Sequence, residues 1–582
     1  MDKRDLIVDV LKKIAILLEL KGENAFKIRA YRTGSEIVET YSGDIIKLAL
    51  DDDLKGIKGI GTALAQKIHE LAATGKLEYF ENLKNEFPQS IFDLFKISNL
   101  GPKKIKILYD QLGIDSISKL KQFCKSGEVG EISGFAKKSV SKILDSISFH
   151  EDNANTFRLG DVAPIAENIL EFLRSHPDTE QAAIAGSYRR GKEILHDLDF
   201  IVSTKSPESI IHSFANMDTV VEIISNGSTK SSIRLDNGLQ CDLRAVSNAE
   251  YPFTLNYFTG SKGHNIQVRA IALKKGYKLN EYGLIPKTDA DADSSISESI
   301  HTESDLYEAL GLKMIHPCLR ENSGELEAAS ENKLPELVIL ENLRGTFHNH
   351  TTASDGKNTL EEMANAAKDL GLQYLGISDH SKSSVQANGL SEEKLLAQIK
   401  EIQSLNNSCP NDFRIFSGVE CDILKDGSLD YDDEILAKLD YCVASVHSSF
   451  SLTEKEMTAR IIKAIENPYV TMIGHLTGRL LLSRKPYSVD VSKVIDACAS
   501  NHTHIEINAN PRRLDMDWRW WRQARDKGVK CSINPDAHRT EHFQFLHFGV
   551  KIAQKGWLGP NDVINCLPLD EIEPTLRIKQ KP

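Results

Sequence analysis

The spacing of hydrophobic positions divides the 582-residue chain into three parts. From residue 4 to 20, apolar side chains recur every three or four positions, as on one face of a helix. Between residues 182 and 246, short apolar runs bounded by glycine and polar residues predict strands. After residue 341, apolar runs alternate with helical stretches, a pattern typical of a β/α barrel. We therefore predict a multidomain α+β and α/β protein with a helical amino-terminal part, a mixed sheet with helices, and a distorted β/α barrel.

A helix, a tight glycine hairpin and a second helix recur three times in the first 150 residues. A glycine turn points backbone N–H groups at the start of the next helix, which suits a DNA phosphate. One copy could be an ordinary helix end. The second copy has Asn99 in place of its first glycine, and the third has Ala136 in place of its second, so the third could serve only packing. The residues predicted to contact DNA are Gly59, Gly61, Lys67, Gly101, Lys103, Lys104 and Gly134.

The stretch from Gly186 to Asp199 combines phosphate-binding and metal-binding residue types. Apolar runs flank its glycine and basic residues, so we predict a strand, a glycine turn, a basic loop and a second strand. Asp197 and Asp199 face one side of that strand, where their repulsion favours a bound Mg²⁺. Gly186 and Ser187 offer backbone N–H groups and a hydroxyl, and Arg189 and Arg190 add guanidiniums, all of which can bind a triphosphate.

A third carboxylate, Asp242, lies in the predicted strand Leu239–Val246. If this strand lies beside Asp197 and Asp199, the three carboxylates form the set that two-metal phosphoryl transfer needs. The alternatives are a solvated turn for the aspartate pair and a surface position for Asp242.

Metal-ligand residue types recur at the ends of the predicted strands after residue 341. His348 and His350 share one face of a predicted strand, so one metal could take both. A single histidine at a strand end is usually structural, but six with three carboxylates at equivalent ends indicate metal ions. The candidate ligands are His348, His350, Asp355, His380, Glu420, His447, His475, Asp536 and His538. Further residues that could hold substrate phosphates are Arg479, Asn508, Arg512 and Arg513.

The net charge of −12 at first argues against a nucleic-acid partner, but the charge is unevenly distributed. Residues 1–150 hold 24 Lys and Arg against 21 Asp and Glu, so the remaining 47 and 62 carry the acidic balance. Nine scattered cysteines without a Cys-x-x-Cys motif indicate reduced thiols in a cytoplasmic protein. No apolar run reaches the ~20 residues that a membrane span needs.

The motif from Gly186 to Asp199, together with Asp242, resembles family X DNA polymerases, and the resemblance extends through Tyr257–Ser261 and Asn280–Gly283. It implies a nucleotidyltransferase palm in which Asp197, Asp199 and Asp242 are catalytic and hold Mg²⁺. It also implies that the Tyr257-Phe258 turn lies against the sugar, although the residues alone read as core. The implied nucleotide-binding residues are Gly186, Ser187, Arg190, Tyr257, Phe258, Gly260, Asn265 and Arg269.

Two further resemblances cover the ends of the chain. Residues 24–40 and 59–76 resemble the amino-terminal lyase domain of the DNA polymerase beta family, which places Lys67 at its Schiff-base position; phosphate binding alone is the other interpretation. The strand-end ligands resemble the PHP domain, the polymerase and histidinol phosphatase domain, whose nine ligand positions are all filled here. That resemblance implies three clustered ions, Mn²⁺ or Zn²⁺, and hydrolysis of phosphodiesters.

The predicted domains are a lyase-like helical domain (1–88), a fingers-like domain (89–150), a palm (151–248), a thumb-like domain (249–315), a linker (316–340) and a PHP domain (341–582). The combined resemblance implies a monomeric repair polymerase that fills short gaps in DNA from dNTPs and carries a 3′–5′ exonuclease. Two alternatives stay open. One is a small-molecule phosphoesterase fused to a nucleotidyltransferase with another acceptor, and the other is an inactive DNA-binding scaffold.

Overall fold

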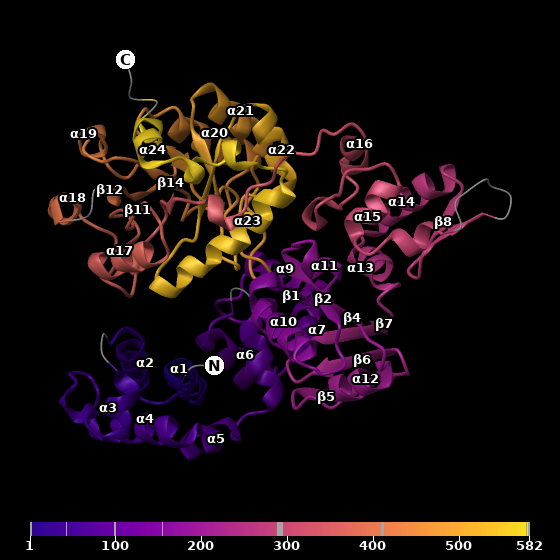
Figure 1. The fold of residues 1–582 in the computed structure, drawn as a ribbon. Coiled ribbons are helices and arrows are strands. Elements are labelled where there is room, and N and C mark those ends of the chain that lie inside the picture. Colours follow the sequence, from indigo (N-terminus) through magenta and orange to yellow (C-terminus); the bar gives the residue numbers. More distant parts are fainter. Residues whose placement is uncertain are drawn as a thin grey trace. The chain divides into compact units, whose positions relative to one another are not determined.

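The computed structural model describes residues 3–41, 44–97, 100–153, 155–287, 295–408, 412–577 and 579. The chain folds into two compact units, residues 1–154 and 155–582 (Figure 1). Among the described residues, no helix is long and apolar enough to cross a membrane.

The first unit is helical, as predicted. Helix α1 (Lys3–Lys21) forms its centre, because the apolar positions Ile7, Leu11, Ile14 and Leu18 are fully buried. One hydrophobic cluster runs from Ile7 to residue 147. The remaining helices are α2 (Ala25–Thr40), α3 (Ile45–Leu50), η1 (Leu54–Gly56), α4 (Thr62–Thr74), α5 (Glu78–Lys84), η2 (Gln89–Lys96), α6 (Pro102–Leu112), α7 (Ile117–Ser126), α8 (Glu128–Glu131) and α9 (Lys137–Asp152).

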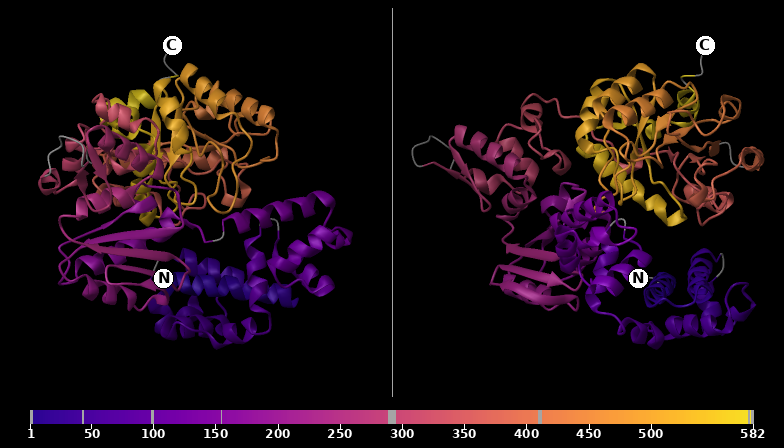
Figure 2. Two further views of the ribbon diagram at one scale, coloured as in Figure 1. Left: turned by 90° about the vertical axis from the view of Figure 1, so that its right-hand side faces the viewer. Right: turned by 180° about the vertical axis from the view of Figure 1, so that it is seen from behind.

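The second unit begins with a mixed five-stranded sheet, here called the palm sheet, whose strands lie side by side in Figure 2. Its order is β2 (Gln181–Ile184), β4 (Asp197–Ser203), β7 (Gln240–Val246), β6 (Lys230–Leu235) and β5 (Val220–Asn226). Strands β4 and β7 are parallel, and the other neighbours are antiparallel. Leu198, Phe200 and Val202 of β4 share a buried core with residues of α10 (Leu159–Arg174) and α12 (Pro207–Ala215). This alternation leaves Asp197 and Asp199 on the opposite face.

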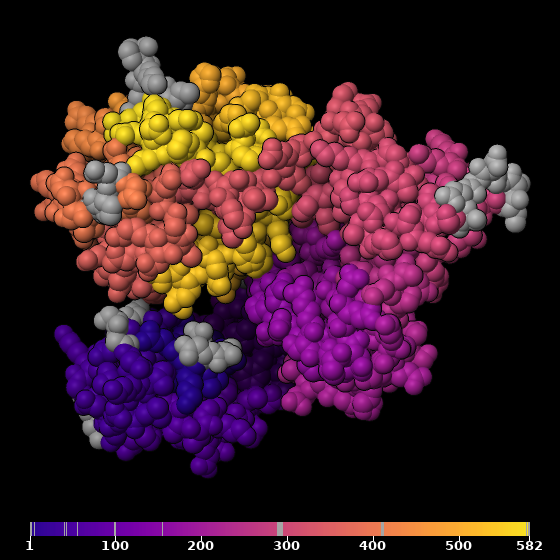
Figure 3. Space-filling model, in the orientation of Figure 1, coloured from indigo at the N-terminus to yellow at the C-terminus, as the bar shows by residue number. Residues whose placement is uncertain are grey.

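A smaller region follows the palm sheet. Its elements are α13 (Tyr251–Thr259), α14 (Lys262–Lys274), β8 (Tyr277–Leu279), β9 (Leu284–Pro286), η3 (Ile296–Ser299), α15 (Glu303–Ala309), η4 (Pro317–Leu319) and α16 (Glu325–Ser330). The sequence indicated a polar, turn-rich linker from residue 316, but Leu319, Leu326 and Ala329 lie in this region's hydrophobic core. Arg320 is fully buried there, because Glu303 accepts its hydrogen bond at 2.6 Å. Residues 334–340 then continue along the surface of the barrel, where Leu558 O accepts from the backbone of Val338 (Figure 3).

The last part is a barrel of parallel strands, as predicted. Two sheets make it: β10 (Gly345–Thr346), β11 (Tyr374–Ile377) and β12 (Arg414–Ser417), and β13 (Glu420–Asp422), β14 (Val443–Ser445), β15 (Met472–Ile473), β16 (His504–Asn508) and β17 (Cys531–Asn534). Single parallel bridges join the sheets at both edges, between His380 and Glu420 and between Asn349 and Ala537. The barrel is therefore closed but irregular.

Helices surround the barrel strands. They are η5 (Leu340–Asn342), α17 (Leu360–Asp369), η6 (Val385–Ala387), α18 (Glu392–Ser408), α19 (Asp433–Leu436), α20 (Glu454–Ile465), α21 (Val491–Ser500), α22 (Trp518–Asp526), η7 (Thr540–Phe545), α23 (Leu546–Lys555), η8 (Pro560–Asp562), η9 (Ile564–Cys566) and α24 (Leu569–Leu576). The prediction that His348 and His350 lie in a strand was wrong, because β10 ends at Thr346. Strand β16 was not predicted, because the polar residues Glu506 and Asn508 interrupt its apolar run.

Candidate active sites and DNA-binding motifs

The three predicted palm carboxylates lie together on one face of the palm sheet. Strands β4 and β7 pair in parallel, with Asp199 directly opposite Asp242 and Asp197 two residues earlier on the same face. Burial and then the charges of Asp197 and Asp242 raise the pKa of Asp199 to about 7. Burial and then Asp242 also raise the pKa of Asp197. Crowded carboxylates of this kind fit Mg²⁺, because a hard cation removes their repulsion and accepts oxygen ligands.

Gly186 lies directly against this carboxylate set. Its φ is +59°, and a Cβ on it would lie 2.1 Å from Oδ2 of Asp199. Glycine is needed here for both reasons. The predicted basic loop was wrong in form, because residues from Gly186 to Arg189 make a single helical turn, α11. A four-residue helix has too few positions to show a helical period in the sequence.

Arg189, the last residue of this turn, and Arg190, which follows it, both reach the smaller region. Arg189 donates to Thr259 Oγ1 at 2.6 Å and to Glu303 at 2.5 Å. Arg190 donates through Nη1 to Thr259 O at 2.5 Å and through Nε to Glu321 at 3.1 Å. Both guanidiniums therefore hold the palm against residues 254–321, and Arg190 is also close enough to oppose the rise in the pKa of Asp199.

Tyr257 and Phe258, predicted as a turn, lie in the last turn of α13, which Gly260 caps with φ +65°. Both side chains are half-buried, and the Phe258 ring stacks 4.1 Å from the Arg244 guanidinium on β7. Asn265 donates to Tyr257 O at 2.7 Å. Its Oδ1 is buried without a hydrogen-bond partner within the described part of the chain, so an acceptor remains available beside the aromatic pair.

All nine predicted barrel ligands come together at the carboxyl end of the strands. Three groups of side chains could each hold an ion, because the ligand atoms inside each group lie within 4.8 Å of one another. The groups are His350, Asp355, His380 and His538; His348, His350 and Asp536; and His380, Glu420 and His447. Nε2 of His475 joins them 2.9 Å from Oε1 of Glu420.

The barrel cluster fits metal ions on the evidence of its own ring nitrogens. Nε2 of His348 and both ring nitrogens of His350 are buried without a hydrogen-bond partner among the described residues. Burial, and then the charges of His538 and His380, lower the pKa of His350 to about 4, so this ring is neutral near pH 7. Neutral imidazole is the form that binds metal. Mixed nitrogen and carboxylate donors suit Mn²⁺ and Zn²⁺.

Of the four residues expected to hold substrate phosphates in the barrel, Arg479 is already engaged. It donates to Arg513 O at 2.9 Å and to Asp517 at 2.8 Å, and its guanidinium also contacts Leu514 O. Asn508 donates to the ligand Asp536 at 3.0 Å. Nε of Arg513 lies 3.4 Å from Oδ2 of Asp536, whereas Arg512 is exposed.

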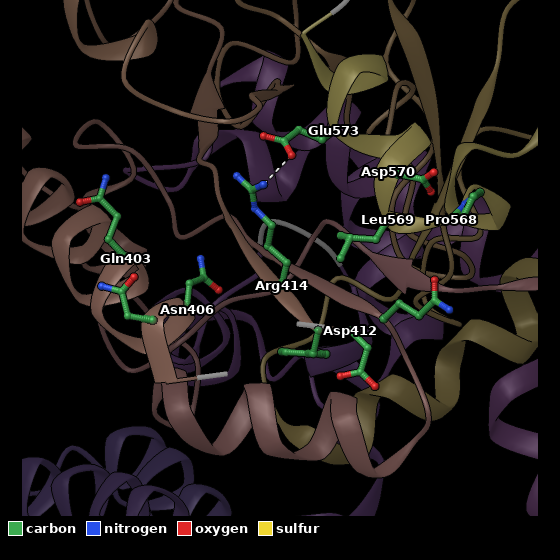
Figure 4. A pocket seen from close by; sticks show the side chains of 11 residues that line it. Gln403, Asn406, Asp412, Arg414, Pro568, Leu569, Asp570 and Glu573 are labelled. Carbon is green, nitrogen blue, oxygen red and sulfur yellow. Dashed lines mark hydrogen bonds and ion pairs between the residues drawn. The ribbon is translucent and has the colours of Figure 1, made fainter. Parts of the chain in front are cut away.

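A polar cavity of 810 Å³ lies at the other end of the barrel, near the first residues of β11 and β12 (Figure 4). Arg414, the first residue of β12, is paired with Glu573 there at 2.5 Å. The lining residues include no predicted metal ligand. Ligands of β/α barrels gather at the carboxyl ends of the strands, so this cavity is separate from the metal cluster.

The predicted glycine hairpins lead into helices α4, α6 and α9 of the first unit. Their N-caps, Gly61, Gly101 and Ala136, make no side-chain cap hydrogen bond among the described residues. Gly59 and Gly134 have positive φ, as tight turns require. Lysines follow in all three copies, at Lys67, Lys103, Lys104, Lys137 and Lys138. The expectation for Asn99 lies outside the described residues. Backbone N–H groups therefore stand open at each helix start, as phosphate binding requires.

Lys67 lies on α4, and its Nζ is 4.8 Å from the centre of the Tyr79 ring. Tyr79 stacks on Tyr31, which is buried. Lys27 approaches the same ring at 5.9 Å. The position predicted for a Schiff-base lysine is thus a basic and aromatic surface site.

Comparisons with known proteins agree with this arrangement. Family models match for a helix-hairpin-helix domain at residues 2–77, a SAM-like helix-hairpin-helix tandem at 91–148, a DNA polymerase beta thumb at 254–321 and a PHP domain at 346–510. A DNA polymerase/3′-5′ exonuclease PolX of Bacillus subtilis (strain 168) is 37% identical over 579 residues, which cover 99% of this chain and 100% of that protein. The chain belongs to the family X DNA polymerases that carry a PHP domain.

Other relatives match parts of this family X chain. DNA polymerase lambda of Arabidopsis thaliana is 24% identical over 342 residues, 53% of this chain and 61% of that protein. A probable phosphatase of Thermoanaerobacter sp. (strain X514) is 32% identical over 230 residues, 38% of this chain and 88% of that protein.

The sequence analysis of this family X protein missed the carboxylates that support the ligands. Glu506 on β16 accepts from Nδ1 of His348 at 2.6 Å, and Asp422 on β13 accepts from Nδ1 of His447. Each bond holds the ring so that Nε2 faces the cluster. Glu506 is fully buried. An acidic residue inside an apolar run was the available signal, because a buried carboxylate needs a partner.

Proposed function

We propose that this protein fills short gaps in DNA by adding dNMP units at the palm sheet and shortens 3′ ends at the barrel cluster. The observation that carries the proposal is that one chain holds two separate clusters of metal-ligand side chains and also contains helix-hairpin-helix domains. The 37% identity to the DNA polymerase/3′-5′ exonuclease PolX of Bacillus subtilis, over the whole length of that protein, supports the presence of both synthesis and hydrolysis in one chain.

At the palm, Asp197 and Asp199 would hold two Mg²⁺ ions, and Asp242 would share the ion nearest the primer 3′-hydroxyl. Bound Mg²⁺ neutralises charge on the triphosphate and lowers the pKa of the attacking hydroxyl. Gly186 lies against the Asp199 carboxylate, and Ser187 follows it on α11. The Gly186 backbone and the Ser187 hydroxyl would cradle the phosphates. Arg190 would add a guanidinium to the triphosphate.

The nucleotide would lie between this cradle and helix α13. Tyr257 and Phe258 present half-buried rings from its last turn, and Gly260 allows the chain to pass close to Arg190, whose Nη1 would lie 3.2 Å from an added Cβ. Asn265 and Arg269 would approach the minor-groove edge of the new base pair, with the unpartnered Oδ1 of Asn265 as an acceptor.

At the barrel, the nine ligands would hold three ions of Mn²⁺ or Zn²⁺. These ions supply an activated water for phosphodiester hydrolysis. Glu506 and Asp422 keep the His348 and His447 rings oriented, and Arg513 would meet the phosphate beside Asp536. We infer a monomer that works in the cytoplasm.

In the first unit, the hairpins at Gly59–Gly61, Gly101 and Gly134 would hold the DNA backbone on either side of a gap. Lys67 would either form a Schiff base with an incised abasic sugar or bind its phosphate. Borohydride trapping on incised abasic DNA distinguishes these roles: a covalent adduct that Lys67→Ala abolishes supports the lyase, and absence of an adduct in the wild type excludes it.

The function is tested with gapped DNA, a recessed primer and p-nitrophenyl phosphate, each with Mg²⁺ or Mn²⁺ and with or without dNTPs. We expect extension to be most efficient on the gap and 3′ shortening to dominate without dNTPs. The match to a probable phosphatase supports a second candidate, a phosphatase for small esters. Efficient p-nitrophenyl phosphate hydrolysis without any change in primer length would favour that candidate.

A further inference from the structure

A buried lysine of the barrel reaches the polymerase part of the second unit. Lys555 is the last residue of α23, and its side chain is fully buried. Its Nζ lies 2.6 Å from Oε1 of Glu321 and donates to Arg190 O at 2.9 Å. A buried ammonium is costly unless it is paired, so these bonds indicate a specific role for the lysine.

Glu321 forms ion pairs with three cationic side chains. Oε1 accepts from Lys555 and from Nε of Arg190 at 3.1 Å, and Oε2 lies 3.2 Å from Nζ of Lys192. Burial disfavours the charged carboxylate, but Lys555, followed by the other two cations, holds the pKa of Glu321 below its usual range. The Trp518 ring closes the cluster, with Lys555 4.8 Å and Lys192 5.4 Å from its centre.

Arg190 is held at both ends of its guanidinium. Nε faces Glu321, and Nη1 donates to Thr259 O at 2.5 Å, next to Gly260. The direction of Arg190 therefore depends on the position of the Glu321 carboxylate.

We propose that Lys555 is a positioning residue of the polymerase site: the barrel, through Lys555 and Glu321, aims Arg190 at the incoming triphosphate. This inference rests on the assignment of Arg190 to triphosphate binding in the proposed function. If Lys555 lost its charge, Glu321 would balance its remaining charge against Arg190 and Lys192 only. The carboxylate would shift toward them, and Arg190 would turn away from the phosphates.

The test is Lys555→Met, which keeps the length of the side chain and removes the charge. Lys551→Met is the matched control, because Lys551 lies on the same helix and contacts the palm through the Tyr188 ring at 4.7 Å. Arg190→Ala provides the reference for loss of the guanidinium. Glu321→Gln, alone and combined with Lys555→Met, tests whether the lysine acts through Glu321.

Steady-state gap filling gives KM for dNTP and kcat, and 3′ shortening without dNTPs reports the barrel. For Lys555→Met we expect KM for dNTP to rise about tenfold with a smaller change in kcat and an unchanged shortening rate. Lys551→Met should leave all three unchanged. In the Glu321→Gln background, Lys555→Met should add less than about twofold.

The possible failures are distinguishable. If Arg190→Ala raises KM but Lys555→Met does not, the proposal is overturned and the role of Arg190 stands. If synthesis and shortening fall together in Lys555→Met, the lysine only supports the fold and the proposal is also overturned. If Arg190→Ala itself leaves KM unchanged, the assignment of Arg190 in the proposed function fails.

Discussion

Replacing Asp199 by asparagine should stabilise the metal-free second unit at alkaline pH. Burial and the neighbouring carboxylates raise the pKa of Asp199 from 3.8 to about 7. Since the unfolded chain ionises first as pH rises, the wild type loses stability between these two values, and the loss is complete above pH 7. Asparagine resembles the protonated form and avoids this loss.

The size of the effect follows from the pKa. A rise from 3.8 to about 7 corresponds to about 4 kcal/mol at pH 8 and to about 2 kcal/mol at pH 5. Asp199 is partly exposed, and solvent reduces the difference between the two pH values to about 1–2 kcal/mol. Asp199→Asn should therefore gain stability over the wild type as pH rises from 5 to 8.

Tryptophan fluorescence during thermal unfolding in EDTA measures this gain, because all four tryptophans lie between residues 518 and 557 and report the second unit. The palm sheet unfolds with them, since one hydrophobic core joins Phe200 to Trp521. Asp218→Asn, at an exposed aspartate of the palm, is the control. In excess Mg²⁺ the wild type should become more stable than Asp199→Asn, because the ion binds the wild-type carboxylates more tightly. If the stability difference between Asp199→Asn and the wild type were the same at pH 5 and pH 8, Asp199 would not have the raised pKa.

Three further predictions concern the two sites. Gly186→Ala should reduce synthesis about a hundredfold and spare 3′ shortening, because the new Cβ would displace the Asp199 carboxylate; primer extension checks this, and retained synthesis would contradict it. Glu506→Gln should weaken metal binding at the barrel about 10- to 100-fold, measured by elemental analysis after dialysis, whereas Glu573→Gln in the distant cavity should not. Although burial opposes it, Glu420 and Asp422 raise the pKa of His447 to about 10. Metal binding must therefore release a proton from this ring, and metal affinity should fall as pH falls from 8 to 6. Calorimetry in two buffers measures the released proton, and a result of no release would contradict the prediction.

Local sequence patterns were sufficient to predict which side chains come together at the two sites. Asp197 and Asp199 face one side because strand side chains alternate, and the barrel histidines meet because parallel strands place their carboxyl ends at one rim. The glycine hairpins were predictable for a similar reason, since Gly59 and Gly134 occupy backbone conformations that few other residues adopt.

Contacts between distant segments could not be predicted in this way. Arg320, Glu506 and Lys555 are buried charges whose partners lie 17, 158 and 234 positions away along the chain. The residues next to them in the sequence give no information on which distant residues pair with them. The helical turn α11 was missed because its four residues are too few to show a repeating apolar pattern.

We propose that the palm sheet and the barrel cluster run opposing reactions on the same DNA end. One assay tests it directly: a 5′-labelled gapped substrate with Mn²⁺, with and without dNTPs, on the wild type, Asp197→Ala and His348→Ala. Asp197→Ala should lose lengthening and keep shortening, and His348→Ala should do the reverse. Loss of both reactions in either single variant, or lengthening retained by Asp197→Ala, would contradict the account.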